Sequence, residues 1–328
     1  MGWGLLGLEG VTGKLAAMIA GGRLPHALIF TGPRGAGKRS LGLALARALN
    51  CENPDAADRP CGQCPPCLKI DRGVHPDVRT LAPSGRSRQI KMEDVQALRA
   101  ETAFRPYEGR AKVFIVSEAD RLNSDSGNAL LKTLEEPPPD SILILTSASE
   151  SEVMATIVSR CLRLRLPPLA YDLMLSAIEE KRDLTGPVAG LLAVLAAGAL
   201  GPALNLDPDE TWRDWSEMDA AMGAAPAPAR LEAAWRWVEA RCGDEEKFPA
   251  LLNVMRLWWR QTALLSVPEL PLREGPPPSE AQRLWAARLT PKALEEIGRA
   301  LGKLEDSLAR FVKPELAFEN YWLTVLRV

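Results

Sequence analysis

A glycine-rich turn near the start of the chain has the spacing of a phosphate-binding loop. Residues 30–40, FTGPRGAGKRS, follow the P-loop pattern G-x-x-x-x-G-K-[ST] up to its last position. Gly32, Gly35 and Gly37 permit a tight turn whose backbone N–H groups can surround phosphate, and Lys38 would reach the outer phosphates. The next position should give a hydroxyl to Mg²⁺, but it holds Arg39, a cationic donor. The stretch indicates either a degenerate site for ATP or ADP or a turn that binds no nucleotide.

A second group used in ATP hydrolysis is missing further along the chain. In P-loop ATPases an apolar strand ends in an acidic pair whose Asp helps to hold Mg²⁺. Here the apolar run KVFIV is followed by Ser117 and Glu118. Glu118 has a carboxylate that can polarise a water molecule, but Ser117 carries no charge, and we interpret Asp120 as a cap or surface carboxylate. The two losses, at Arg39 and Ser117, argue together against hydrolysis.

Four of the six cysteines have the spacing of a metal site. They form the pattern C-x9-C-x2-C-x2-C and are Cys51, Cys61, Cys64 and Cys67. Close C-x2-C steps let thiolates converge on one tetrahedral ion, and four sulfurs leave no open position for catalysis. The pattern predicts a structural zinc site; the alternative is four free thiols in a loop. Cys161 and Cys242 are isolated, and we expect both to be buried.

The elements that must position these groups alternate between strands and helices. Apolar, β-branched runs at 27–31, 112–117 and 141–147 predict strands, and RCLRLRL at 160–166 alternates as a half-solvated strand would. The stretch 124–136 predicts a helix that ends before three prolines. Strands that alternate with helices predict an α/β domain with a parallel sheet.

The second half of the chain predicts helices. An Ala/Leu-rich helical segment runs from about 169 to 206, and later helices are separated by proline-rich loops. Seven of the nine tryptophans lie between Trp212 and Trp285, which favours a helical core in this region. A further apolar helix face is expected at Leu294, Ile297, Leu301, Leu304 and Leu308.

Composition restricts the class of partner. The 328 residues include 46% hydrophobic and 25% charged residues, with a net charge of −2. This balance excludes a global basic surface for nucleic acid, so any DNA contact would be local or shared with other subunits. The first residues lack the basic start of a signal peptide, and no apolar run is long enough to span a membrane, so we expect a cytoplasmic protein.

Taken in order, these motifs resemble a known family. The match runs from about Arg23 to Pro168 and includes GRLPHALIFTGPRGAGK, the cysteine module, HPDVRTLAP, KVFIVSEADRLN, NALLKTLEEPP and VSRC. It is similar to the delta prime family of the bacterial DNA polymerase III clamp loader, a family of AAA+ proteins. The similarity fades over the helical half, where only PELAFENYWLTVL matches.

The resemblance implies a role for one arginine. Members of this family commonly lack hydrolysis and supply an arginine in trans to the ATP site of a neighbouring motor subunit. Here that arginine finger would be Arg160, in Ser159-Arg160-Cys161; the alternative is an ordinary surface arginine like Arg163 and Arg165. AAA+ lids often carry a γ-phosphate sensor arginine in G-x-x-G-R-A-L, and Pro202 occupies that position in this chain.

The resemblance also implies three domains and a set of partners. We expect an AAA+ P-loop domain with the zinc module over 1–168, a helical lid over 169–206 and a helical collar that joins subunits over 207–328. The partners would be motor (gamma/tau) and delta subunits in a ring, and, through the complex, the sliding clamp and primer-template DNA. The function expected is that of a non-motor clamp-loader subunit. Two alternatives stay open, an active motor ATPase of the same loader and a stand-alone zinc-containing DNA binder.

Overall fold

The chain folds into two compact units in the computed structural model, which describes residues 3–85, 88–223, 227–241, 247–267, 274–310 and 312–327. The first unit contains Met1–Leu173 together with Gly198–Pro202, and the second contains Met174–Ala197 and Ala203–Val328. The predicted division into three domains, with boundaries at 168 and 206, stays a prediction.

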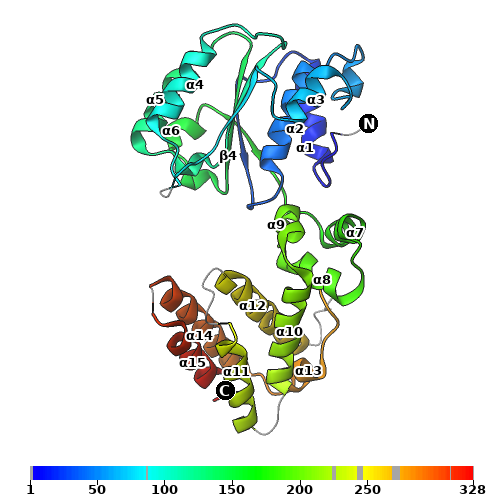
Figure 1. Cartoon of the computed structure of the whole chain (residues 1–328), viewed down its shortest axis with the longest axis vertical. Coiled ribbons are helices and arrows are strands. Elements are labelled where there is room, and N and C mark those ends of the chain that lie inside the picture. Colours follow the sequence, from blue (N-terminus) through cyan, green and yellow to red (C-terminus); the bar gives the residue numbers. More distant parts are fainter. Residues whose placement is uncertain are drawn as a thin grey trace. The chain divides into compact units, whose positions relative to one another are not determined.

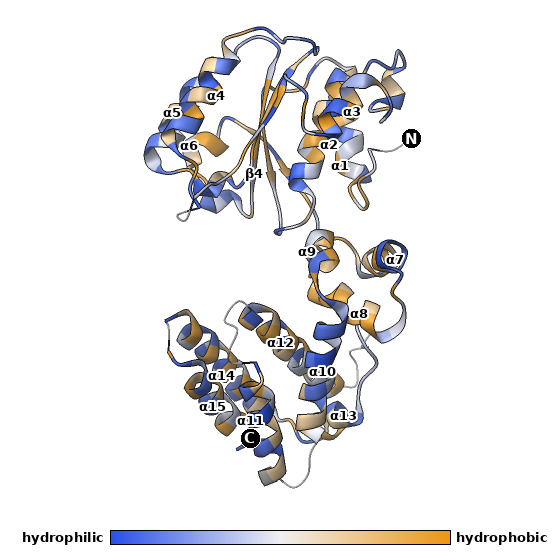
Figure 2. Ribbon diagram, viewed as in Figure 1, coloured by the Kyte–Doolittle hydropathy of each residue, from blue (hydrophilic) through white to orange (hydrophobic). Residues whose placement is uncertain are grey.

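The first unit is built around a five-stranded sheet in the order β2-β3-β4-β1-β5, with all neighbours parallel. The strands are β1 (Ala27–Thr31), β2 (Val78–Leu81), β3 (Lys112–Val116), β4 (Ser141–Ser147) and β5 (Leu162–Arg165). Every residue of β1 and β3 is buried, because inner parallel strands are covered on both faces. Figure 2 shows this apolar character along the sheet. The predicted parallel α/β fold is confirmed.

Helices cover both faces of this sheet (Figure 1). The helices on one side are α1 (Glu9–Ala20), α2 (Lys38–Asn50) and α3 (Pro65–Asp71), and those on the other are α4 (Met92–Thr102), α5 (Ser124–Glu135) and α6 (Ala155–Val158). Short 3₁₀ turns are η1 (Ala56–Asp58), η2 (Ala119–Arg121) and η3 (Glu150–Glu152). Each side has its own apolar cluster, with Leu45 and Phe30 in one and Leu130 and Ile29 in the other.

The order of the strands brings three chain segments together at one end of the sheet, where the strands finish. β1 pairs with β4, with Thr31 opposite Ser147, and β3 pairs with β4, with Val116 opposite Leu145. The turns after β1 and β3 and the last residues of β4 therefore meet at the carboxyl ends of adjacent strands. In open α/β sheets, ligands bind just beyond the carboxyl ends of the strands.

The second unit is helical among the residues that the structure describes. Its helices are α7 (Tyr171–Arg182), α8 (Gly186–Leu195), α9 (Leu200–Asn205), α10 (Pro208–Gly223), α11 (Ala227–Glu239), α12 (Phe248–Leu265), α13 (Glu280–Ala286), α14 (Pro291–Ala309) and α15 (Pro314–Val325). The first residues of α7 and of α9 belong to the first unit. The tryptophans form its core, as predicted: Trp258 and Trp322 are fully buried, and Trp259 packs edge-on against Trp258 and Trp285. Within the described residues, we find no helix with the length and apolarity required to cross a bilayer.

Candidate functional site

The predicted glycine-rich turn connects β1 to α2, and the strand predicted before it, at 27–31, is confirmed. All three glycines have positive φ angles: 147° at Gly32, 78° at Gly35 and 84° at Gly37, which is the N-cap of α2. These values lie in regions that residues with a Cβ seldom adopt, which explains glycine at each position. The turn thus has the backbone that a phosphate-binding loop requires.

Lys38 folds back onto this turn. Its Nζ donates hydrogen bonds to the carbonyl oxygens of Gly32, at 2.7 Å, and Pro33, at 2.6 Å. Burial lowers the pKa of the Lys38 ammonium below its ordinary value, although the Asp120 carboxylate opposes this shift. Arg39 is exposed on the first turn of α2, and its cation stands where a magnesium-binding hydroxyl would be needed.

The segment that carries Pro202 contacts the middle of the turn. Gly201 donates its N–H to the carbonyl oxygen of Gly35 at 3.3 Å. A Cβ placed on Gly35 would lie 2.1 Å from Cδ of Pro202, well inside van der Waals contact. The position predicted for a γ-phosphate sensor therefore lies against the P-loop, but it holds a proline that carries no charge.

The residues after β3 include one carboxylate held by arginines. Glu118 has φ 53° and donates its backbone N–H to Oγ1 of Thr146, at the end of β4. Its carboxylate lies 3.4 Å from Nη2 of Arg88 and 3.9 Å from Nη2 of Arg34. The group expected to polarise water is thus paired with two cations, one of them from the P-loop. Beside it, the Ser117 hydroxyl is buried and has no hydrogen-bond partner among the described residues.

Asp120 is turned inward, which corrects the interpretation of this residue as a surface or capping group. Its side chain is only 13% exposed, and its Oδ1 accepts a hydrogen bond from Ser147 Oγ at 3.1 Å. It is also the carboxylate that most strongly favours the charged form of Lys38. The polar residues Thr146 and Ser147 at the end of the apolar strand β4 are a sequence signal that could have located these contacts.

The four predicted cysteines come together beside α2. Their Sγ atoms all lie within 4.8 Å of one another, and those of Cys51 and Cys64 are 3.9 Å apart. Zinc–sulfur bonds of about 2.3 Å in a tetrahedron place the sulfurs about 3.8 Å apart, so the cluster has the size for one such ion. The backbone N–H groups of Gln63 and Cys64 lower the pKa of the Cys61 thiol to about 6, which favours the thiolate that binds metal.

Helix ends and a short loop build this cluster. Cys51 is the C-cap of α2, Cys64 is the N-cap of α3, and Cys67 lies within α3. Between them the loop is held by Arg59, whose Nε donates to the carbonyl oxygen of Asn53 at 2.7 Å. Burial raises the pKa of the Cys67 thiol, so a bound cation would be needed to keep this group deprotonated.

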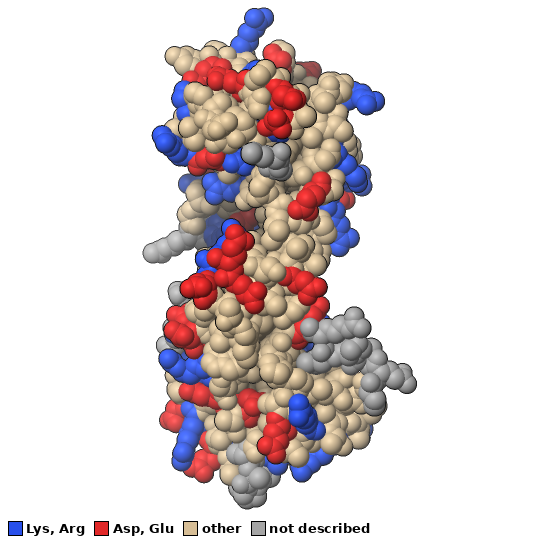
Figure 3. All heavy atoms as spheres, turned by 90° about the vertical axis from the view of Figure 1, so that its right-hand side faces the viewer, with Lys and Arg blue, Asp and Glu red and all other residues tan. Residues whose placement is uncertain are grey.

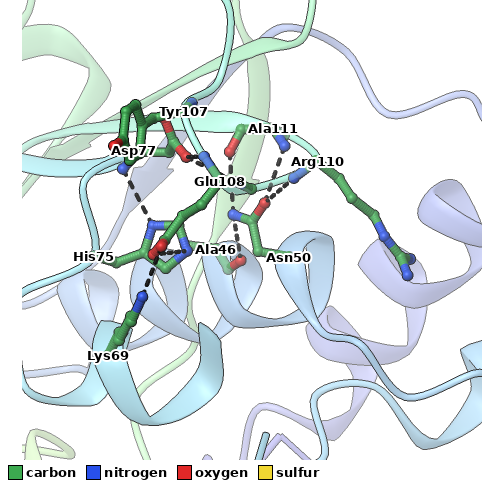
Figure 4. A network of polar contacts seen from close by, with 10 residues as sticks. Ala46, Asn50, Lys69, His75, Asp77, Tyr107, Glu108, Arg110 and Ala111 are labelled. Carbon is green, nitrogen blue, oxygen red and sulfur yellow. Dashed lines mark hydrogen bonds and ion pairs between the residues drawn. The ribbon is translucent and has the colours of Figure 1, made fainter. Parts of the chain in front are cut away.

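A polar network with buried residues at its centre joins the cysteine module to the segment before β3 (Figure 4). The Asp77 carboxylate accepts hydrogen bonds from the N–H groups of Tyr107, Glu108 and Gly109 at 2.7 to 2.9 Å. Burial alone would raise the pKa of Asp77, but these donors bring it below its ordinary value. Lys69, on α3, pairs with Glu108 at 2.6 Å.

Two buried residues complete this network. His75 accepts a hydrogen bond at Nδ1 from the N–H of Asp77, and its Nε2 lies 3.7 Å from Oε1 of Glu108. Asn50, directly before Cys51, accepts hydrogen bonds from the N–H groups of Arg110 and Ala111. These contacts of His75 and Asn50 join separate chain segments and are structural.

Arg160 lies away from the P-loop of its own chain. It follows α6 and precedes β5, in which Leu162 pairs with Leu28 near the start of β1. The P-loop leaves the other end of β1, and strand residues 28 to 32 alone separate the two ends by about 13 Å.

Both Nη atoms of Arg160 have partners in the same chain. Its Nη2 is 2.7 Å from Oε1 of Glu135, and its Nη1 donates to the carbonyl oxygen of Thr156 at 2.8 Å. The side chain is still 37% exposed. The neighbouring Cys161 is buried as expected, and burial raises the pKa of its thiol to about 12; Cys242 lies outside the described residues.

The fold and the site together define the class of protein, an AAA+ P-loop domain with a cysteine cluster and a helical second half. A family described as "DNA polymerase III, delta subunit" matches residues 8–170. The DNA polymerase III subunit delta' of Escherichia coli is 33% identical over 236 residues, which cover 66% of this chain and 70% of that protein. The chain therefore belongs to the delta prime family of DNA polymerase III clamp-loader subunits, as the resemblance indicated.

The same comparison extends to a longer relative. The DNA polymerase III subunit tau of Escherichia coli is 32% identical over 329 residues, covering 98% of this chain but 49% of tau, so the chain spans about half the length of that protein. A solved Thermotoga maritima protein related to the gamma subunit of DNA polymerase III aligns over 96% of this chain and 98% of that one, with 17% identity and a TM-score of 0.45.

Proposed function

We propose that this chain is a non-motor subunit of a bacterial replicative clamp loader. It helps to load the sliding clamp onto primed DNA and supplies Arg160 in trans to the ATP site of a neighbouring motor subunit. Its partners are motor (gamma/tau) and delta subunits, and the helical region over 207–328 serves as the collar that joins them. The family assignment supports this set of partners.

The observation that carries the proposal is the position of Arg160. The side chain lies at the amino end of β5, while the P-loop of the same chain follows the carboxyl end of the adjacent strand β1. Since Arg160 cannot reach its own P-loop, an arginine finger here serves only another subunit. Removing a trans-acting arginine lowers turnover strongly in GTPases, because the guanidinium stabilises charge on the transferring phosphoryl group.

Four residues support the absence of hydrolysis by the chain itself. Arg39 stands where a magnesium-binding hydroxyl is expected, and Ser117 stands where a magnesium-binding carboxylate is expected. Pro202, which carries no charge, occupies the position of the γ-phosphate sensor and lies against Gly35. The Lys38 ammonium donates its hydrogen bonds to the carbonyl oxygens of Gly32 and Pro33 in the loop. Nucleotide binding without turnover at Gly32, Gly35, Gly37 and Lys38 remains compatible with this proposal.

One observation favours the alternative of an active motor. The Asp120 side chain points inward and lies close enough to Lys38 to favour the charged form of the lysine. It provides a carboxylate at the carboxyl ends of the strands, where magnesium would bind. Asp120 lies three residues after Ser117, the position of the missing carboxylate, however, and its Oδ1 already accepts a hydrogen bond from Ser147. The non-motor function therefore accounts for more of the site.

The cysteine cluster fits a structural zinc ion, which Cys51, Cys61, Cys64 and Cys67 would hold. A closed shell of four sulfurs supplies folding stability rather than chemistry. A stand-alone zinc-containing DNA binder would need a basic patch around the module. On the face shown in Figure 3, basic and acidic side chains are interspersed, which disfavours that alternative.

The experiment that tests the proposal compares two loader complexes, one with the wild-type chain and one with Arg160→Ala. DNA-stimulated ATP hydrolysis and clamp loading are measured in both. Lower rates with Arg160→Ala, at unchanged assembly, would support the proposal. Equal rates would refute it.

A further inference from the structure

One carboxylate contacts the arginine assigned above to the neighbouring ATP site. Glu135 is the last residue of α5, and its Oε1 lies 2.7 Å from Nη2 of Arg160. The two residues are 25 positions apart in sequence and come from different elements, so the pair is a product of the fold. Figure 1 shows α5 and α6 on the same face of the sheet.

A close approach between these two helices permits the pair. A Cβ placed on Gly127, in α5, would lie 2.3 Å from Sδ of Met154, the N-cap of α6, and 3.7 Å from Cδ1 of Ile157. Glycine at this position leaves room for the side chain of Met154 against α5. This packing fixes the direction in which the chain leaves α6, and it therefore sets the position of the Arg160 backbone two residues later.

The end of α6 holds the other side of the guanidinium. Nη1 of Arg160 donates to the carbonyl oxygen of Thr156 at 2.8 Å, and the Ser159 hydroxyl donates to the same carbonyl at 3.0 Å. Helix carbonyls near a C-terminus lack partners within the helix, so cationic donors are favoured there. Arg160 is thus held at both Nη atoms, by α6 and by Glu135.

The location of Glu135 is unfavourable for a carboxylate that has no cationic partner. The C-terminus of a helix carries partial negative charge, which disfavours acidic residues. Arg160 compensates this charge, and the ion pair limits the many rotamers of a long side chain. Guanidinium has five N–H donors, so the contacts with Glu135, Thr156 and Ser159 leave others free for phosphate oxygens.

We infer that Glu135 is a positioning residue for Arg160: it holds the guanidinium in one direction before the neighbouring subunit's nucleotide arrives. This inference rests on the proposed function of Arg160. Holding the side chain in advance lowers the cost of ordering it in the transition state, in which water attacks the γ-phosphorus and ADP leaves.

The test uses the whole loader complex, reconstituted with chains that carry Glu135→Gln, Arg160→Ala or both changes. Glutamine keeps the size of the side chain and removes its charge. Since exposed ion pairs contribute modestly, Glu135→Gln should lower kcat for DNA-stimulated ATP hydrolysis about two- to fivefold, with KM for ATP unchanged. In the Arg160→Ala background, Glu135→Gln should have no further effect.

Glu136→Gln is the matched control, because Glu136 is the adjacent exposed carboxylate at the end of α5. It should leave kcat unchanged. Thermal unfolding of each variant shows whether the pair acts only on stability, in which case Tm falls and kcat does not.

The outcomes separate the two proposals. If Arg160→Ala lowers kcat but Glu135→Gln does not, or if the two effects multiply, Glu135 is no positioning residue and the proposed function stands. If Arg160→Ala itself has no effect, the proposed function and this inference both fail.

Discussion

Pro202 fills the space beside the Cα of Gly35, where a Cβ would lie 2.1 Å from the proline Cδ. The two residues are far apart in sequence, and Gly201 adds a backbone hydrogen bond to the carbonyl oxygen of Gly35. The segment Gly198–Pro202 is therefore part of the first unit, and it packs on the turn that would hold phosphate. The contact explains why glycine stands at position 35.

Gly35→Ala should therefore destabilise the protein. Alanine at φ 78° is strained, and its Cβ would collide with Pro202, so we expect a loss of about 2 kcal/mol in the free energy of unfolding. Gly13→Ala is the control, because Gly13 lies within α1 with open space around it and should be neutral or slightly stabilising. Chemical denaturation measures both; equal stability of Gly35→Ala and wild type would contradict the contact.

The isolated chain should hydrolyse ATP no faster than a Lys38→Ala variant. The reason is the combined absence of a magnesium-binding hydroxyl at Arg39, a carboxylate at Ser117 and a charged sensor at Pro202. A steady-state phosphate-release assay with Mg²⁺ checks this. Robust magnesium-dependent turnover that disappears with Lys38→Ala would favour the motor alternative.

The fold was largely predictable because its signals are local. The apolar runs that form β1, β3 and β4 are buried strands, and the alternation of Leu and Arg in β5 matches its half-exposed pattern. β2 was not predicted, because it is a short edge strand with exposed Arg79 and Thr80. The spacing of the four cysteines also predicted their convergence.

The missed parts of the site depend on contacts between distant segments. The inward direction of Asp120 depends on Ser147 in the adjacent strand. The pair between Glu135 and Arg160 depends on how α6 packs on α5. No spacing within one segment encodes such contacts, so only the folded chain reveals them.

The protein should contain one Zn²⁺ per chain. Cys64→Ser should lower the metal content and the thermal stability together, because metal binding to four thiolates contributes to folding. Cys161→Ala, which changes a buried cysteine outside the cluster, should keep the metal. Elemental analysis of protein never exposed to chelator tests this; well under one equivalent in the wild type would count against the site.

Stability should fall as the pH drops below about 6.5, the ordinary pKa of histidine, because His75 is buried. Burial lowers the pKa of His75 in the folded state, against the opposing effects of Glu108 and Asp77, so the unfolded chain binds more protons in this range. The contribution of the neutral imidazole is fully present above pH 6.5 and is lost as the pH falls toward the folded-state pKa.

The pH prediction is checked by denaturation between pH 7.5 and 5 with His75→Asn as the control. Asparagine can still accept the hydrogen bond from the Asp77 N–H, although the smaller side chain should lower stability at every pH. The variant should show a shallower loss with pH than the wild type. Parallel curves would show that His75 does not cause the effect.

The central claim is that Arg160 acts on another subunit's ATP, and DNA-stimulated ATP hydrolysis by the reconstituted loader tests it most directly. Arg160→Ala should lower the rate, with 10³–10⁵ as an upper guide from GTPases, while assembly and zinc content stay unchanged. Arg163 is an exposed arginine on β5 whose Nη1 lies 3.7 Å from Oε2 of Glu150. Arg163→Ala controls for loss of charge, and the complex that carries it should hydrolyse ATP at the wild-type rate. If both variants match the wild type, or both fail equally, Arg160 is an ordinary surface arginine and the account is wrong.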